Sequence, residues 1–149
     1  MATILRAPAS MVNPTIERFM TKTPHTIGHR QTLAAAHRLM NDHGIRHLPV
    51  LDSGKLVGIL SQHDLHLIET LRDVKPEEVE VNEAMTPTPF TVSARASLRK
   101  VASEMAAHKY GSAVVMEKDR VVGVFTTIDA LRALCALLAE ERPASPGRR

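Results

Sequence analysis

The chain contains an internal repeat, which restricts the possible folds more than any other feature of the sequence. Residues Ile16–Leu67 align without a gap to Val81–Arg132, a shift of 65 positions, and 13 of the 52 aligned pairs are identical. A repeat of this length indicates that one structural unit occurs twice. We therefore expect two similar units packed around a pseudo-two-fold axis, so that any site between them comes in near-equivalent pairs.

The most informative part of the repeat is the pair of segments Gly58–Asp64 and Gly123–Asp129. Each segment has a glycine and two apolar residues at the end of a predicted strand. A hydroxyl (Ser61 or Thr126) follows at the strand-to-helix junction, and a carboxylate comes three residues later. The N-terminus of a helix offers free backbone N–H groups that bind anions. This chemistry suits a nucleotide, with N–H and hydroxyl groups for phosphate and the carboxylate for the ribose.

Hydrophobic periodicity and turn residues predict the same elements in both units: strand, helix, hairpin and helix after a short lead-in. In the first unit these are the lead-in Thr15–Met20, strand His25–Ile27, helix Gln31–His43, hairpin strands Arg46–Leu51 and Lys55–Leu60, and helix Gln62–Arg72. In the second unit they are Val81–Met85, Phe90–Val92, Ala96–Lys109, Ser112–Met116 with Arg120–Phe125, and Thr127–Ala139. Gly44 is predicted to end its helix in the left-handed conformation, and Ser61 to cap the next one.

The predicted fold class is therefore α/β (α+β), with two tandem strand-helix-strand-strand-helix units. The expected divisions are an irregular lead-in 1–14, unit one 15–73, an acidic linker 74–80, unit two 81–139 and a mobile tail 140–149.

Composition narrows the function classes. The 149 residues suffice for a buried core, and no apolar run reaches the roughly 18 residues of a membrane span. The N-terminus lacks the apolar length of a signal peptide, and the single Cys135 excludes an internal disulfide framework. These features favour a cytoplasmic protein. The net charge of +3 is mild, although a pI near 9.4 keeps nucleic acid among the possible partners.

The last predicted helix is apolar on nearly all sides, because Arg132 is the only polar residue in Ala130–Ala139. Such a helix is buried on more than one side. We predict a homodimer contact through this helix, assisted by Leu65, Ile68 and Leu71 of the equivalent helix. The alternative is a helix wedged between the two units.

The repeated unit and its strand-end Gly-x-x-Ser/Thr-x-x-Asp segment resemble the CBS-domain family, which takes its name from cystathionine β-synthase. Met20-Thr21 and Met85-Thr86 before each first strand agree with this resemblance, as does His47–Asp52 in the first hairpin. The resemblance covers about residues 15–139 and implies a stand-alone CBS pair, also called a Bateman module. Members of the family bind AMP, ADP, ATP or S-adenosylmethionine between the two units and regulate other proteins. The resemblance thus implies a regulatory sensor, with an adenosine ligand, a separate regulated chain and no required cofactor.

The resemblance assigns roles to the repeated segments. Asp64 and Asp129 match the ribose-binding carboxylate of the family, and Ser61 and Thr126 match the hydroxyl that meets phosphate or ribose oxygens. The alternative for the acids is a favourable position in the first turn of a helix, and for the hydroxyls plain N-capping.

The two strand-end glycines have a similar pair of interpretations. Gly58 and Gly123 would let the backbone approach a ligand closely, or strand packing alone requires them.

The residues that open the hairpins differ between the units. Arg46 and His47 begin the first hairpin, where basic residues hold phosphates in some family members, whereas Gly111 and Ser112 occupy the matching positions. We predict that the two sites differ and that the one lined by Arg46 and His47 favours more phosphate, with His63 beside Asp64 assisting. The alternative is a surface arginine and a half-buried histidine.

An adenine ring needs an apolar slot, for which hairpin and strand residues are candidates, although such residues are more often plain core. The candidates are Ile27, Ile45, Pro49, Ile59, Val92, Val114 and Val124.

Other chemistries receive little support. Eight histidines raise the possibility of a metal site, but neither His43 with His47 nor His63 with His66 is completed by Cys or Glu in a recognised tetrahedral set. No catalytic triad or P-loop is present, and a thiol in an apolar helix is usually inert. We therefore expect neither a metal nor enzymatic activity. The alternatives to a sensor are a ligand-independent dimeric scaffold and a nucleic-acid-binding protein.

Overall fold

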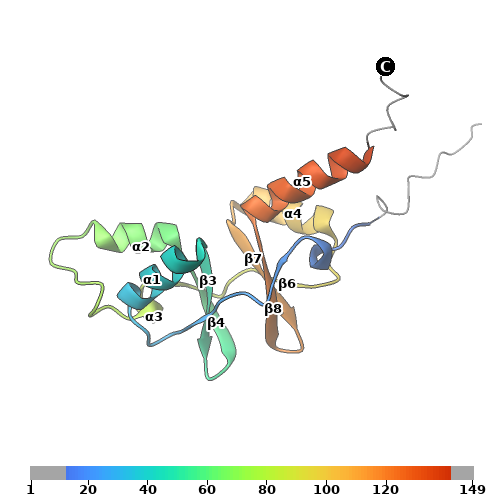
Figure 1. The fold of residues 1–149 in the computed structure, drawn as a ribbon. Coiled ribbons are helices and arrows are strands. Elements are labelled where there is room, and N and C mark those ends of the chain that lie inside the picture. The colour runs from blue at the N-terminus through green and yellow to red at the C-terminus, as the bar shows by residue number, and fades with distance from the viewer. Residues whose placement is uncertain (1–12, 142–149) are drawn as a thin grey trace, which may run out of the picture.

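The computed structural model describes residues 13–141, so residues 1–12 and 142–149 of the expected lead-in and tail lie outside the description. Two four-stranded sheets stand side by side, with α1 and α2 beside one sheet and α4 and α5 beside the other (Figure 1). The elements of the first half are η2 (Ile16–Arg18), β1 (Thr21–Lys22), β2 (Ile27–Gly28), α1 (Leu33–His43), β3 (His47–Asp52), β4 (Lys55–Ser61) and α2 (Gln62–Glu69). Those of the second half are α3 (Val81–Ala84), β5 (Thr86–Pro87), β6 (Thr91–Ser93), α4 (Leu98–His108), β7 (Ser112–Glu117), β8 (Arg120–Thr126) and α5 (Thr127–Glu141).

The predicted α/β fold with two repeated units is confirmed, and the registers of the two halves match. In each half a parallel pair (β2–β3 or β6–β7) is followed by an antiparallel hairpin. Both hairpins carry an irregularity at the same place, between Val50 and Leu51 and between Val115 and Met116. The two sheets therefore present equivalent strand-to-helix junctions.

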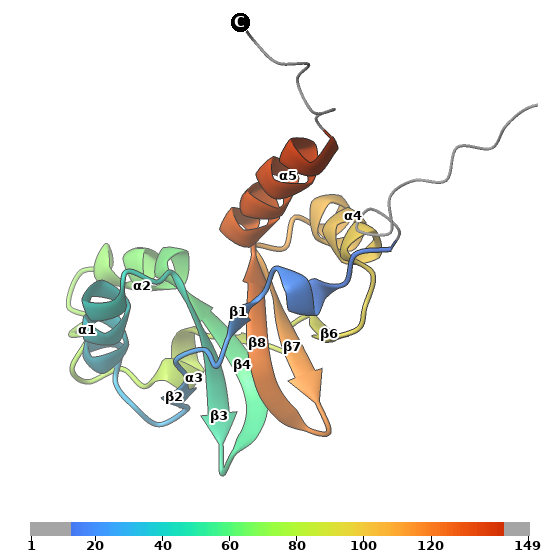
Figure 2. The same cartoon turned by 45° about the vertical axis from the view of Figure 1, so that its right-hand side comes forward.

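Two short strands cross between the halves. β1 comes from the first repeat but pairs with β8, and β5 comes from the second repeat but pairs with β4. In Figure 2 the blue lead-in lies beside α4, and the chain then passes along β8 before it reaches β2. Accordingly Ile16 packs in the core of the second sheet and Val81 in that of the first. The predicted divisions at residues 15 and 81 follow the sequence repeat, whereas the packing exchanges the leading segments of the two repeats.

The strand-end glycines make this exchange possible. A Cβ atom on Gly123 would lie 2.5 Å from Sδ of Met20 and 3.1 Å from the carbonyl oxygen of Thr21. A Cβ on Gly58 would lie 2.4 Å from Sδ of Met85. Because methionines of the exchanged segments lie against both glycines, packing alone accounts for them, as one of the two interpretations held.

The predicted capping residues are confirmed, whereas the predicted end residues of two helices differ from the observed ones. Gly44 ends α1 with a φ of +60°, and Ser61 caps α2 through a capping box with Asp64. Helix α2 ends at Glu69 rather than at Arg72, and α5 continues to Glu141 rather than ending at 139. Each hairpin turn has two residues rather than three, and both turn residues have positive φ, the pattern of a type I′ turn.

The apolar last helix is not wedged between the units. Helix α5 leaves the end of β8 and projects beyond the sheets (Figures 1 and 2). Leu131, Leu134 and Leu138 are each more than half exposed, at 57%, 52% and 54%. Leu65 is buried in the core of its own unit and Ile68 packs against that core, so neither is available for the predicted contact. The exposed apolar residues of this region are Leu67 on α2 and Leu71, which follows the helix.

Candidate functional site

A cavity of about 660 Å³ lies where the two units meet, and we call it the basic cavity. Three parts of the chain form it: the crossing from β1 toward β2, the turn from α1 into β3, and the junction of β8 with α5. Its lining residues are Thr21, Lys22, Thr23, Pro24, His25, His43, Gly44, Ile45, Arg46, His47, Val124, Thr126, Thr127, Ile128, Asp129 and Arg132. A cleft of this size is typical of small-molecule sites.

The acidic group of the basic cavity is Asp129, which is buried with 4% of its surface exposed. Its Oδ2 atom accepts hydrogen bonds from the backbone N–H and hydroxyl of Thr126, at 2.9 and 3.2 Å. The hydroxyl of Thr21 lies 3.3 Å from Oδ1, and Nη1 of Arg132 lies 4.0 Å from the same oxygen. Oδ1 is thus the less engaged oxygen and keeps capacity to accept further hydrogen bonds.

The equivalent Asp64 has fewer partners. Its Oδ2 accepts the backbone N–H of Ser61 at 2.8 Å, and its own N–H donates to the Ser61 hydroxyl at 3.1 Å. Both acids therefore act as capping residues in the protein without ligand, as the simpler interpretation held. Capping engages one carboxylate oxygen, so it does not prevent a ligand from using the other.

Arg46 and His47 come from the first repeat but line the cavity of the second acid. We expected His63 to assist them, but the basic cavity has Ile128 and Asp129 in its lining and not His63. The cavity differs from the expected one because the chain segments that form it belong to both repeats, although His47 also lies near Asp64. In the sheet itself Arg46 stays next to the first junction, since its carbonyl accepts the N–H of Gln62 at 2.8 Å.

His47 is half-buried and lies under the influence of both acids. Burial is the main cause that lowers the pKa of His47 below its usual value of 6.5. The carboxylates of Asp64 and Asp129 act in the opposite direction, and the charge of Arg46 lowers the pKa further. The absence of a side chain at Gly111 makes room for the ring, because a Cβ there would lie 3.2 Å from Nε2 of His47. His47 therefore gains its charge at a lower pH than an exposed histidine does.

The other predicted residues lie on the strands around the junctions. Gly123 lies on β8 and Gly58 on β4, against their methionines, and Ser112 pairs with Thr126 in the sheet. Of the adenine-slot candidates, Ile45 and Val124 line the basic cavity, whereas Pro49 and Val114 are fully buried.

The sequence reasoning missed four basic residues of the cavity: Lys22, His25, His43 and Arg132. The imidazole rings of His25 and His43 stack with their centroids 3.7 Å apart. Lys22 and His25 lie on the segment that crosses between the sheets, and the exchange of β1 was not visible in the sequence. An alignment of the two repeats would have marked these two residues, since Lys22 is aligned with Pro87 and His25 with Phe90.

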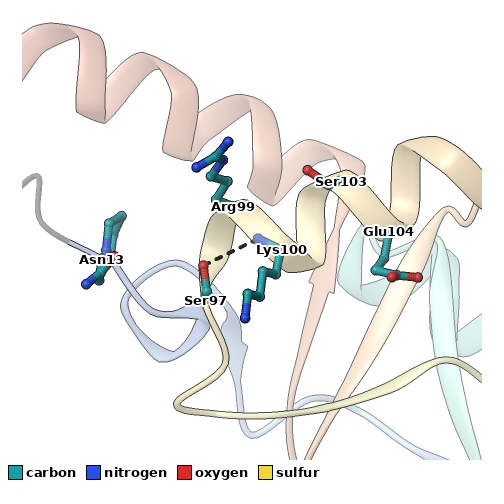
Figure 3. Close-up of a pocket in the computed structure, with 7 residues that line it drawn as sticks. Asn13, Ser97, Arg99, Lys100, Ser103 and Glu104 are labelled. Carbon is teal, nitrogen blue, oxygen red and sulfur yellow. Dashed lines mark hydrogen bonds between the residues drawn. The ribbon is translucent and has the colours of Figure 1, made fainter.

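A second cavity of about 670 Å³ lies away from the repeated junctions, at the start of α4 (Figure 3). Its lining includes Arg99, Lys100 and Glu104, with Ser97 capping the helix through the N–H of Lys100 at 3.3 Å. These are ordinary surface and capping groups, so this cavity has less binding chemistry than the basic cavity.

Within residues 13–141, no group of three or more His, Cys, Asp or Glu side chains is arranged to hold a metal ion. In the same range no helix has both the length and the apolar character required to cross a bilayer. Cys135 is exposed on α5.

The fold and the paired junctions define a tandem module with a cavity between its halves. The CBS domain model matches residues 16–67 and 80–136, so this chain belongs to the CBS domain family. It is 31% identical over 114 residues to inosine-5′-monophosphate dehydrogenase from Korarchaeum cryptofilum, covering 76% of this chain but 23% of the dehydrogenase. Because the match is a minor part of that enzyme, its catalysis does not transfer to this chain.

Two solved structures have nearly the same extent as this chain. AcuB, a protein assigned to acetoin utilization in Vibrio cholerae, superimposes with a TM-score of 0.77 at 34% identity, covering 89% of this chain and all of that one (100%). The CBS domain pair of protein MJ0100 has a TM-score of 0.73 at 26% identity, with 83% and 98% of the two chains covered. That pair was solved in complex with 5′-methylthioadenosine and S-adenosyl-L-methionine.

Proposed function

We propose that this protein is a regulatory module that binds an adenosine compound between its two CBS units and thereby modulates a separate protein. The basic cavity carries the proposal, because it joins Thr126 and Asp129 of one repeat to Arg46 of the other. A ligand there contacts both halves, so its binding free energy depends on how they are arranged. Such a differential affinity is what a ligand needs to shift a protein between two states. The adenosine compounds in the MJ0100 pair support this choice of ligand class.

Each group of the cavity has a role toward such a ligand. The ribose hydroxyls donate to Oδ1 of Asp129, the oxygen with the weaker contacts. The adenine lies against Ile45 and Val124, and the guanidinium of Arg46 pairs with phosphate in a charge-assisted hydrogen bond.

The equivalent junction of the other half has Ser61 and Asp64, and the repeat has Gly111 and Ser112 at the positions of Arg46 and His47. It lacks the cations of Arg46 and His47 at the matching positions. We propose that it accepts an adenosine compound with less phosphate.

The module acts as a homodimer through the exposed face of α5, with Leu131, Leu134 and Leu138. Monomeric proteins rarely expose a continuous apolar patch of this kind. Light scattering at micromolar concentration is expected to give the dimer mass, and Leu134→Glu to give the monomer mass. Ala107→Glu on the exposed surface of α4 is the matched control. A monomer mass for the unaltered chain would contradict the dimer.

The same apolar face favours a second candidate function, a scaffold that works without ligand. In that case the clefts are vestigial and α5 alone recruits the partner. Neither function requires catalysis by this chain.

Calorimetric titration with AMP, ADP, ATP and S-adenosylmethionine tests the proposal and separates the two candidates. Binding of at least one compound in the micromolar range is expected, with Asp129→Ala or Asp64→Ala abolishing the site that contains the altered acid. Since each acid also caps a helix, circular dichroism must show that the variants remain folded. The absence of heat and of any thermal shift with all four compounds would leave the scaffold function.

A further inference from the structure

The basic cavity gathers cations from several elements around one acid. Lys22 lies on β1, Arg46 directly precedes β3, and Arg132 lies on α5. The only carboxylate of the lining is Asp129, and its charge is already partly satisfied by Thr126. A single phosphate group places its negative charge at one point, so it does not match cations on three separate elements. A ligand whose negative charge is spread along a chain of phosphates suits them better.

Three imidazoles complete the same lining. His47 is half-buried opposite Gly111, and the rings of His25 and His43 stack at 3.7 Å between centroids. A charged ring at His47 is repelled by the neighbouring charge of Arg46. An anion bound beside both residues offsets this repulsion, because an opposite charge nearby favours the protonated form of His47.

We infer that the ligand of the basic cavity is a nucleoside polyphosphate, and that it binds together with a proton taken up by His47 in the cavity wall. This inference rests on the proposed function and adds to it the charge class of the ligand and a dependence on pH. The protein then responds to both nucleotide and acidity through one site.

The direction of the pH dependence follows from the groups around the imidazoles. They are Lys22 on β1, His25 after it, His43 on α1, Arg46 and His47 at β3, Asp64 on α2, and Asp129 and Arg132 on α5. In the free protein burial keeps the pKa of His47 below 6.5, so its ring is neutral at pH 7.5. The polyphosphate raises this pKa in the complex, and affinity therefore increases as the pH falls. By linkage the increase approaches about tenfold per pH unit for each proton taken up.

The test is calorimetric titration of the full chain with ADP and with adenosine at pH 7.5, in buffers of different ionisation enthalpy. The dependence of the observed heat on the buffer gives the number of protons taken up. We expect uptake with ADP, none with adenosine, and ADP affinity at least about threefold higher at pH 6.5 than at pH 7.5. His47→Gln is expected to remove most of the uptake.

His47→Asn, a second neutral replacement, keeps the test valid if His47→Gln fails to fold. His66→Gln, on the exposed surface of α2 and outside the cavity lining, is the matched control. ADP binding without proton uptake, or with uptake that neither His47 variant reduces, would overturn the inference and leave the proposed function standing. Absence of binding by any adenosine compound would instead overturn the proposed function.

Discussion

The strand-to-helix junctions of the two halves have nearly the same backbone but different side chains around them. Strand registers, hairpin irregularities and capping acids repeat from one half to the other. Five basic residues of the basic cavity nevertheless have neutral residues at the equivalent positions of the other repeat. The basic residues and their neutral equivalents are Lys22 and Pro87, His25 and Phe90, Arg46 and Gly111, His47 and Ser112, and Arg132 and Leu67. In the other direction Lys109 replaces Gly44, and His63 replaces Ile128.

Aromatic rings gather in the second repeat where the first has histidines. Tyr110 lies 5.1 Å from Phe90 and 5.1 Å from His108, measured between ring centroids. In the first repeat Tyr110 corresponds to Ile45, Phe90 to His25 and His108 to His43. Glycines and methionines that are identical in both halves hold the exchanged segments in place, and we expect the residues that differ to set what each junction binds.

The largest loss of stability is expected at Gly58 and Gly123, the strand-end glycines against which the exchanged segments pack. Gly123→Ala places a Cβ against Met20 and 3.1 Å from the carbonyl oxygen of Thr21, so we expect the free energy of unfolding to fall by about 2–3 kcal/mol. Gly58→Ala should do the same through Met85. Urea denaturation measures both.

Gly28→Ala is the matched control, because its Cβ would meet only the Cγ of Gln31 at an ordinary 3.6 Å. Equal stability of all three variants would show that the exchanged segments adapt without cost, and that the two halves are not held by these contacts.

The next largest effect concerns the affinity of the basic cavity for phosphate, which depends on Arg46. Arg46→Ala is expected to lower the affinity for ADP about tenfold and to leave that for adenosine unchanged, since a charged hydrogen bond contributes roughly 1.5–3 kcal/mol before screening. Arg120→Ala, on an exposed strand end, serves as the control. Equal losses for ADP and adenosine would mean that Arg46 supports the cavity wall rather than the phosphates.

The local signals of the sequence were sufficient for most of the fold. Glycine at the end of α1, serine before α2 and alternating apolar residues in the hairpins act over a few residues. The hydroxyl and the hairpin pattern occur again in the second copy, whereas Lys109 takes the place of the glycine at the end of α4. Helix α2 was predicted too long because Leu71 continues the apolar pattern after the helix has ended, where its N–H donates to the carbonyl of Ile68 in a turn.

The site was harder to predict because it depends on which segments cross between the sheets. Thr126, Asp129, Arg46 and His47 were identified from motifs, yet they were assigned to different cavities. A two-residue strand such as β1 carries too little pattern to reveal its partner, so nothing placed Lys22 beside Arg46. The burial of His47, and hence the direction of its pKa shift, also depends on this long-range packing.

Smaller effects are expected at the two helix caps. Ser61→Ala should lower the free energy of unfolding by about 1 kcal/mol, the usual value of an N-cap. Thr126→Ala should cost somewhat more, because the Thr126 hydroxyl also donates to Asp129 at 3.2 Å. Thermal unfolding measures the difference, and Thr126→Ser should restore most of the loss. A larger loss at Ser61 would contradict the view that the second junction is the more tightly held.

The smallest effect concerns the pH dependence of stability without ligand. Because burial lowers the pKa of His47 in the folded state, the unfolded chain binds the extra proton first as the pH falls below 6.5. Stability is therefore expected to decrease from pH 6.5 downward until the folded-state pKa is reached, and His47→Gln should flatten this part of the profile. Thermal unfolding between pH 7.5 and pH 5 measures the slope, with His66→Gln as the exposed control. An unchanged slope in His47→Gln would show that other groups set the acid response, and that the histidine of the basic cavity matters only when an anion is bound.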